Sequence, residues 1–137
     1  MLEPSVPPTL TYMGLPPAPP RLTRAAEHPD AFAGYLVSSA SLWVGDEEAT
    51  RDAAALVKRG GAGGKPMYVS VGGTEGSSMT DTSAHYVAAL AGPKSGFRVE
   101  RQVWPGETHG SVYPWALLKG LPYVLPPEPG QTARAGD

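Results

Sequence analysis

The feature that most constrains the fold of this chain is a regular alternation of short apolar runs with longer helix-forming segments between residues 31 and 125. Residues 35–39 and 67–71 are short runs that contain β-branched and aromatic side chains, which is typical of buried strands. Residues 97–104 alternate polar with apolar side chains, which predicts a strand with one solvated face.

A helix-forming segment follows each of these strands. We expect helices at residues 47–59, from Ser78 or Thr80 to residue 91, and at residues 112–125, with the glycine-rich residues 60–64 ending the first. This order predicts an α/β fold, with about three parallel strands, right-handed connections and flanking helices. Because an apolar parallel strand is poorly suited to an edge, so small a sheet is expected to be incomplete.

The two ends of the chain differ from this middle part. Residues 1–20 contain seven prolines, which favours an irregular or disordered segment because proline lacks the N–H that helices and central strands need. We therefore expect a partial α/β domain at residues 21–125, beginning with a short helix at residues 22–27, and a disordered tail at residues 126–137. The N-terminus has no basic start and no apolar run, so a cytoplasmic location is the default expectation.

Composition excludes several classes of function. A formal net charge of -2 gives no basic footprint for nucleic acid. No apolar run approaches the ~18 residues of a membrane span, so no membrane partner is expected. Without cysteine, and with its three histidines scattered, the sequence predicts neither a metal site nor a cofactor. The absence of isoleucine and asparagine, beside 17 glycines and 16 prolines, indicates a GC-rich gene.

One histidine occupies a position where chemistry is common. His109 lies in the loop that leaves the third expected strand, and ligands of open α/β sheets bind beyond the carboxyl ends of the strands. Glu75 leaves the preceding strand in the same way, so its carboxylate could orient the imidazole of a general base. The alternative for His109 is an exposed loop histidine. His85, in the middle of the second helix, is expected to be on the surface or half buried.

Three segments together resemble the family of enterochelin and other siderophore esterases and esterase-D-like acyl hydrolases. Residues 29–43 (PDAFAGYLVSSASLW) are similar to that family's "DxFxxYxxxSPSLWW" stretch, and residues 67–75 resemble its strand ending in "VGGxE". Residues 105–112 (PGETHGSV) are similar to its "PGETHxSV" histidine loop, and a closing "ALxxGLxYL" helix follows at residues 116–124. The resemblance covers roughly residues 28–125, in matching order and spacing.

The resemblance implies the C-terminal half of an α/β-hydrolase fold and transfer of an acyl group from a small-molecule ester to water. His109 would then be the catalytic histidine. Glu75 would be its orienting acid, with Asp46 and Asp81 as alternatives, in agreement with the usual chain order of acid before histidine. Trp43 would line the substrate pocket, and its alternative is a tryptophan in the core beside the sheet.

The sequence departs from the family at the nucleophile. The Gly-x-Ser-x-Gly elbow should precede residue 32 by one helix, but residues 12–21 (YMGLPPAPPR) contain no serine. A frameshift or a misassigned start in a GC-rich gene would account for this. Losing the nucleophile costs on the order of 10⁶ in kcat, so we expect a truncated serine esterase that is inactive alone. The alternative is a non-catalytic α/β module that associates, as a homo-oligomer for example, through an exposed strand edge.

Overall fold

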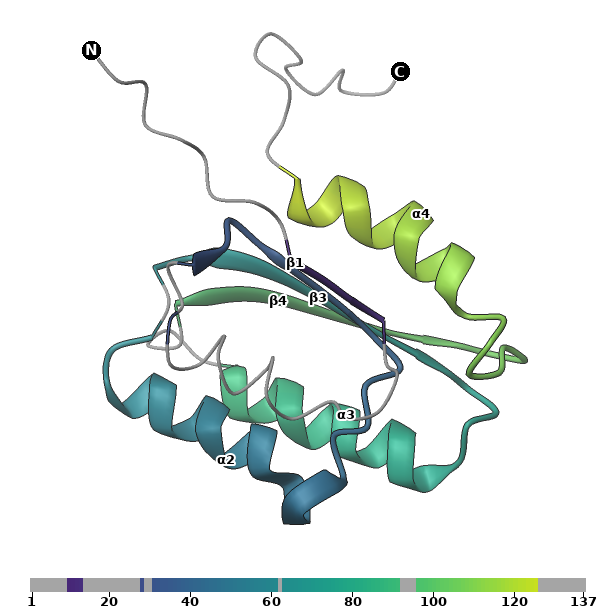
Figure 1. Ribbon diagram of the computed structural model, residues 1–137, viewed down its shortest axis with the longest axis horizontal. Helices are drawn as coiled ribbons and strands as arrows, with labels where there is room; N and C mark the ends of the chain where they lie inside the picture. The colour runs from purple at the N-terminus through teal and green to yellow at the C-terminus, as the bar shows by residue number, and fades with distance from the viewer. Residues whose placement is uncertain (1–9, 14–27, 29–30, 62, 92–95, 126–137) are drawn as a thin grey trace, which may run out of the picture.

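The computed structural model describes residues 10–13, 28, 31–61, 63–91 and 96–125 (Figure 1). The elements in this part of the chain are β1 (Leu10–Met13), β2 (Tyr35–Ser38), α2 (Val44–Lys58), β3 (Lys65–Gly72), α3 (Ser77–Leu90), β4 (Phe97–Trp104) and α4 (Tyr113–Val124). The helix expected at residues 22–27, most of the proline-rich segment and the tail from residue 126 lie outside the described residues.

The strands form one parallel sheet in the order β1-β2-β3-β4. β3 and β4 pair along their full length, from Lys65 beside Phe97 to Gly72 beside Trp104. The α/β class and the parallel sheet predicted from the sequence are confirmed, and each strand from β2 onward is followed by a helix. All four strands therefore point their carboxyl ends toward the same edge of the sheet.

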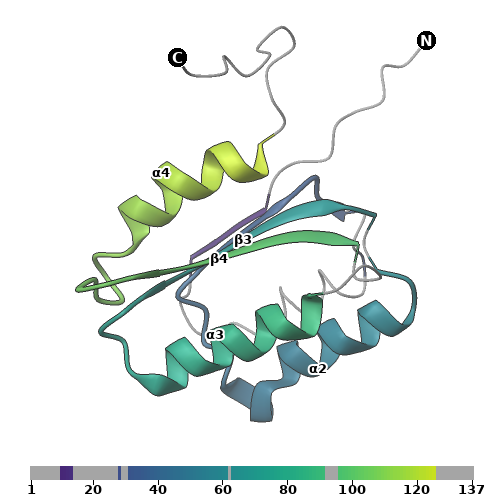
Figure 2. The same ribbon diagram turned by 180° about the vertical axis from the view of Figure 1, so that it is seen from behind.

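Helices cover both faces of the sheet. α2 and α3 lie side by side on one face and α4 lies on the other, as the two opposite views show (Figures 1 and 2). Alternate side chains of the central strands divide between two cores: Tyr35 and Val37 of β2 pack in the cluster under α2 and α3, whereas Leu36 packs with Ala116 and Val124 of α4. This alternation is the two-residue period of a strand that is buried on both faces.

One short strand was not expected. Residues 10–13 fall in the range predicted to be irregular, yet they form β1 and pair with β2 from Leu10 beside Tyr35 to Met13 beside Ser38. The run LTYM contains no proline, so each of its residues can donate a backbone hydrogen bond. Because of β1, β2 has a strand on either side, which is the position that its apolar sequence suits.

The start of α2 also differs from a regular helix. Gly45, Asp46 and Glu47 have φ angles of 63°, 54° and 58°, so they form a left-handed turn before the right-handed helix begins. Left-handed backbone costs about 1–2 kcal/mol for each non-glycine residue. The guanidinium of Arg51 donates to the carbonyl oxygens of Gly45 and Asp46, which helps to hold this turn in place.

Candidate functional site

The loops that leave β3 and β4 are joined by backbone hydrogen bonds. The N–H of Gly73 donates to the carbonyl oxygen of Trp104 at 2.8 Å, and the N–H of Thr74 donates to that of Glu107 at 3.1 Å. The hydroxyl of Thr74 donates to the same Glu107 oxygen at 2.7 Å. The two loops therefore continue the pairing of β3 with β4 beyond the end of the sheet.

Glycine at the end of β3 allows this close approach. A Cβ atom on Gly72 would lie 2.5 Å from the carbonyl oxygen of Glu107 and 2.9 Å from that of Thr108. A Cβ atom on Gly73 would lie 3.0 Å from the carbonyl oxygen of Trp104. Any larger residue at Gly72 would push the two loops apart, so the close approach of the loops requires glycine at this position.

The loop that carries His109 is built from two local motifs. Residues 104–107 form a turn in which the N–H of Glu107 donates to the carbonyl oxygen of Trp104 at 3.2 Å, with Gly106 at φ 80°. Proline followed by glycine is the signature of this type II turn. Next, the N–H of Thr108 donates to Oγ of Ser111 at 2.9 Å, and the N–H of Ser111 donates back to Oγ1 of Thr108 at 3.2 Å.

The side chains of Glu75 and His109, one from each of these loops, contact each other. Oε2 of Glu75 lies 2.8 Å from Nδ1 of His109. The Glu75 side chain is 2% exposed and that of His109 is 45% exposed, so a buried carboxylate holds an accessible ring. Because a carboxylate can only accept hydrogen bonds, Nδ1 carries the proton and the lone pair of the neutral ring is on Nε2.

The other oxygen of the Glu75 carboxylate is also bound. Oε1 accepts a hydrogen bond from the hydroxyl of Ser39 at 2.5 Å and from the N–H of Gly72 at 2.6 Å. Ser39 follows β2, is 1% exposed and has a φ angle of 46°, an uncommon value for a residue other than glycine. Three successive strands thus contribute to the pair: Ser39 after β2, Glu75 after β3 and His109 after β4.

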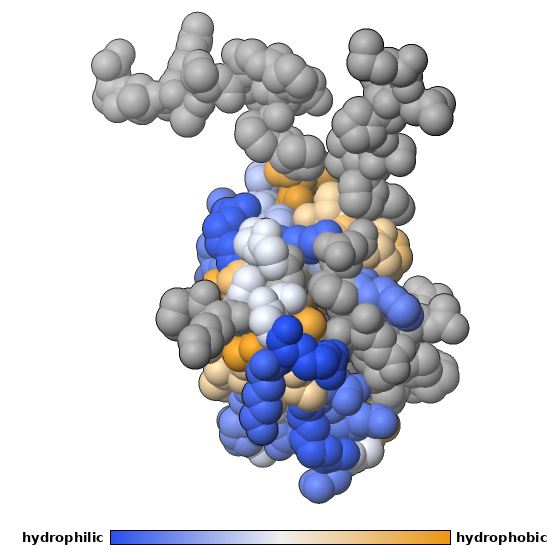
Figure 3. Space-filling view, turned by 90° about the vertical axis from the view of Figure 1, so that its left-hand side faces the viewer, coloured by the Kyte–Doolittle hydropathy of each residue, from blue (hydrophilic) through white to orange (hydrophobic). Residues whose placement is uncertain are grey.

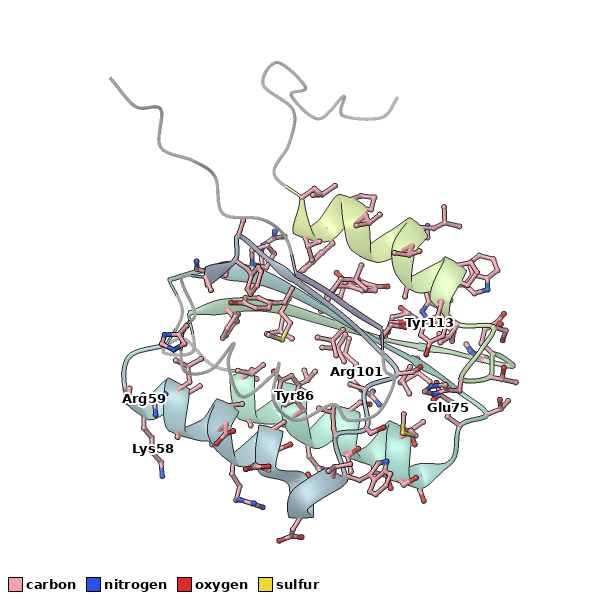
Figure 4. The ribbon with its side chains drawn as sticks, viewed as in Figure 1. Lys58, Arg59, Glu75, Tyr86, Arg101 and Tyr113 are labelled. Atoms are coloured by element: carbon pink, nitrogen blue, oxygen red, sulfur yellow. The ribbon has the colours of Figure 1, made fainter. Side chains whose placement is uncertain are left out.

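Tyr113 contacts the opposite side of the imidazole. Its hydroxyl oxygen lies 3.1 Å from Nε2 of His109, and the two rings meet edge to face with centroids 5.8 Å apart. Burial raises the pKa of Tyr113, and the negative charge of Glu75 raises it further. Figure 4 shows Glu75 and Tyr113 at the same end of the sheet.

The alternative acids lie in other surroundings. Asp46, in the left-handed turn of α2, lies 3.7 Å from Arg51, and Asp81 of α3 accepts a hydrogen bond from Thr80. Of the three acids considered from the sequence, Glu75 is the one that contacts His109. Trp43 precedes α2 and is 52% exposed, so it is not a core residue. His85 is exposed, as expected, and its Nδ1 lies 3.0 Å from the carboxylate of Glu47.

Ser39 and Tyr113 were not identified from the sequence. Ser39 lies in no Gly-x-Ser-x-Gly motif, and its buried hydroxyl donates to the acid. Tyr113 follows His109 by four residues, and this spacing is the one signal that could have indicated a contact. Nearby, Trp115 is 42% exposed and stacks on Trp104 with ring centroids 5.4 Å apart.

The opposite end of the sheet has a different surface. It carries Lys58 and Arg59, which follow one another at the end of α2 (Figure 4), and hydrophilic side chains cover much of its lower half (Figure 3). In the part of the chain that the structure describes, no three His, Asp or Glu side chains gather as they would around a metal ion. Over the same residues, no helix is both long and apolar enough to cross a bilayer.

Comparison with solved structures identifies the fold. The chain superimposes on the BES protein from Bacillus cereus with a TM-score of 0.66 and 22% identity, over 77% of this chain and 41% of that one. It superimposes on the siderophore hydrolases EstB and EstA from Aspergillus nidulans with TM-scores of 0.57 and 0.55 and identities of 20% and 18%. These matches cover 73% and 74% of this chain and 42% of each hydrolase.

The chain thus has the α/β fold of part of these three structures and spans about two fifths of their length. The fold shared with the two siderophore hydrolases agrees with the α/β-hydrolase fold that the resemblance of the sequence motifs implies. No family model and no curated protein sequence matches the chain.

Proposed function

We propose that this chain carries the acid and the general base of a serine ester hydrolase site, with His109 as base and Glu75 as orienting acid. The observation that carries the proposal is the 2.8 Å contact between a buried carboxylate and an accessible imidazole, at the carboxyl ends of adjacent parallel strands. The bond from Glu75 selects the Nδ1–H tautomer, which leaves Nε2 to take a proton from an attacking hydroxyl.

Support for the reaction class comes from the motifs around both residues and from the fold shared with siderophore hydrolases. The substrate class is a small-molecule carboxylic or siderophore ester. No Gly-x-Ser-x-Gly elbow occurs in the sequence, and Ser39, the serine that contacts Glu75, is buried and bonded to the acid. We therefore propose that the isolated chain does not turn over esters and that a nucleophile must come from a complementing segment.

Fluorophosphonate labelling followed by peptide mapping tests this proposal, because such probes react with activated serines. We expect no serine adduct with the isolated chain, while a standard esterase is labelled in parallel. A single labelled serine whose labelling is lost in His109→Ala would refute the inactivity and establish a complete site. Labelling that persists in His109→Ala would refute the role of His109 as base.

The orienting role of Glu75 is tested separately by ¹⁵N NMR of the imidazole, which distinguishes the two neutral tautomers. We expect the Nδ1–H tautomer of His109 in the wild type and a mixture in Glu75→Gln. Glu107→Gln is the matched control, because Glu107 lies in the same loop and accepts a hydrogen bond from Ser111. A tautomer ratio that is the same in Glu75→Gln and the wild type would exclude the proposed role.

A second function is favoured by the position of β1. It forms one edge of the described sheet, and the chain covers about two fifths of each structural neighbour. Backbone groups on an open strand edge can pair with another chain. The corresponding proposal is a non-catalytic α/β module that associates through β1 with a second copy or a partner. Light scattering would show a mass that rises with concentration, whereas a monomer mass at every concentration would rule out self-association.

A further inference from the structure

Tyr113 occupies the side of His109 that faces away from the acid. Its hydroxyl oxygen lies 3.1 Å from Nε2, and its ring meets the imidazole at an interplanar angle of 77°. The reciprocal hydrogen bonds between Thr108 and Ser111 close the turn around His109, and Tyr113 begins α4 two residues later. The contact therefore lies within the same continuous segment of loop and helix that presents the histidine.

The direction of the hydrogen bond follows from the acid. Glu75 accepts from Nδ1, so Nε2 of the neutral ring has a lone pair and no proton. The phenol of Tyr113 must then be the donor. A phenol is protonated at neutral pH, and burial and the charge of Glu75 both raise the pKa of Tyr113 further.

We propose that Tyr113 caps the general base: its hydroxyl donates to the lone pair of Nε2 and must be displaced before His109 can accept a proton from an attacking hydroxyl. The inference deepens the proposed function, since it concerns the same imidazole. In that reaction Nε2 takes the proton of the nucleophile, and it cannot do so while the phenol occupies it. A neutral hydrogen bond of ordinary strength would reduce the available base about fivefold.

Acylation of histidine by diethyl pyrocarbonate tests the cap, because the reagent attacks the lone pair of an unprotonated imidazole. The rate at His109 is measured by peptide mapping at neutral pH in the wild type and in Tyr113→Phe, which keeps the aromatic ring and removes the hydroxyl. We expect His109 to react about fivefold faster in Tyr113→Phe. Tyr123→Phe is the matched control, because Tyr123 lies on the same helix and its hydroxyl donates to the carbonyl oxygen of Arg98.

The exposed His85 gives an internal standard in every digest. Faster reaction at His109 with an unchanged rate at His85 supports the cap. An unchanged or slower rate at His109, or an equal increase at both histidines, overturns it. This assay involves no ester turnover, so its outcome does not depend on the fluorophosphonate test. The cap can be confirmed while labelling excludes His109 as base, and the role of His109 as base can be confirmed while the cap is overturned.

Discussion

Replacing Gly72 with alanine should separate the two loops that form the site. Gly72 is the last residue of β3, and its N–H donates to Oε1 of Glu75. The added methyl group would lie 2.5 Å from the carbonyl oxygen of Glu107, 2.9 Å from that of Thr108 and 2.9 Å from Oε1 of Glu75. Real Cβ contacts essentially never fall below 3.0 Å, so the Glu107 carbonyl would have to move by about 0.5 Å or more.

The magnitude follows from what must move. Two of the three atoms are backbone oxygens of a loop that is tied to β3 by the hydrogen bonds of Gly73 and Thr74, so they cannot rotate away as a side chain could. Overpacking of this kind costs about 1–3 kcal/mol. Alanine offsets up to about 0.5–1 kcal/mol of this loss in the free energy of unfolding, because it restricts the unfolded chain more than glycine does. We expect a net loss of about 1–2 kcal/mol in the free energy of unfolding.

Urea denaturation measures this loss, which for a chain of this size is a fall of about 1 M in the midpoint at an unchanged m-value. The matched control is Gly110→Ala, because a Cβ atom on Gly110, next to His109, would have no neighbour within 4 Å. The ¹⁵N signals of His109 should also lose the fixed tautomer in Gly72→Ala but not in Gly110→Ala. Equal midpoints and equal tautomer ratios in the two variants would refute the steric argument.

Three further substitutions follow from the same structure. Ser39→Ala removes a buried donor to Glu75 and should lower the free energy of unfolding by about 1–2 kcal/mol in urea, with a mixture of His109 tautomers by NMR. Gly120→Ala places a Cβ atom 2.6 Å from Cδ1 of Leu36 and should cost about 1–3 kcal/mol in the same assay. Burial raises the pKa of Tyr86, so above pH 10.0 the unfolded chain loses this proton while the folded chain keeps it. The free energy of unfolding should then fall by about 1.4 kcal/mol per pH unit from this residue alone, and Tyr86→Phe should remove that part of the slope in urea titrations at several pH values.

The regular elements could be predicted because their local patterns agree with their places in the sheet. β4 runs from Phe97 to Trp104, as the alternation of polar and apolar residues predicted, and its exposed residues Arg98 and Glu100 lie on one face. β3 and α3 begin and end within a few residues of their predicted limits. The glycine-rich residues 60–64 precede β3, and Gly72 and Gly73 separate its strand pattern from the helical pattern of α3. In these segments the local preference and the tertiary position favour the same structure.

The features that were missed depend on contacts between distant segments. β1 has only four residues, and its strand conformation depends on pairing with β2 rather than on a strong local pattern. The left-handed turn before α2 is stabilised by hydrogen bonds from the side chain of Arg51, which lies in the helix itself. Propensity scales for single residues do not include such a contact. The hydroxyl of Ser39 donates to Glu75, which lies 36 residues later in the sequence. This contact depends on the carboxyl ends of β2 and β3 lying side by side in the sheet, so no local pattern indicates it.

The pair of Glu75 and His109 depends on structural features that also stabilise the fold. The bond from Gly72 to the carboxylate, the backbone bonds of Gly73 and Thr74, and the turn at Gly106 all join the carboxyl ends of β3 and β4. A chain that kept these contacts for stability alone would still present an acid beside a histidine. These contacts fix the orientation of the imidazole. Proton transfer takes place at Nε2, the atom that Tyr113 contacts and that a nucleophile would need, so the reactivity of Nε2 distinguishes a catalytic base from a histidine that only stabilises the loop.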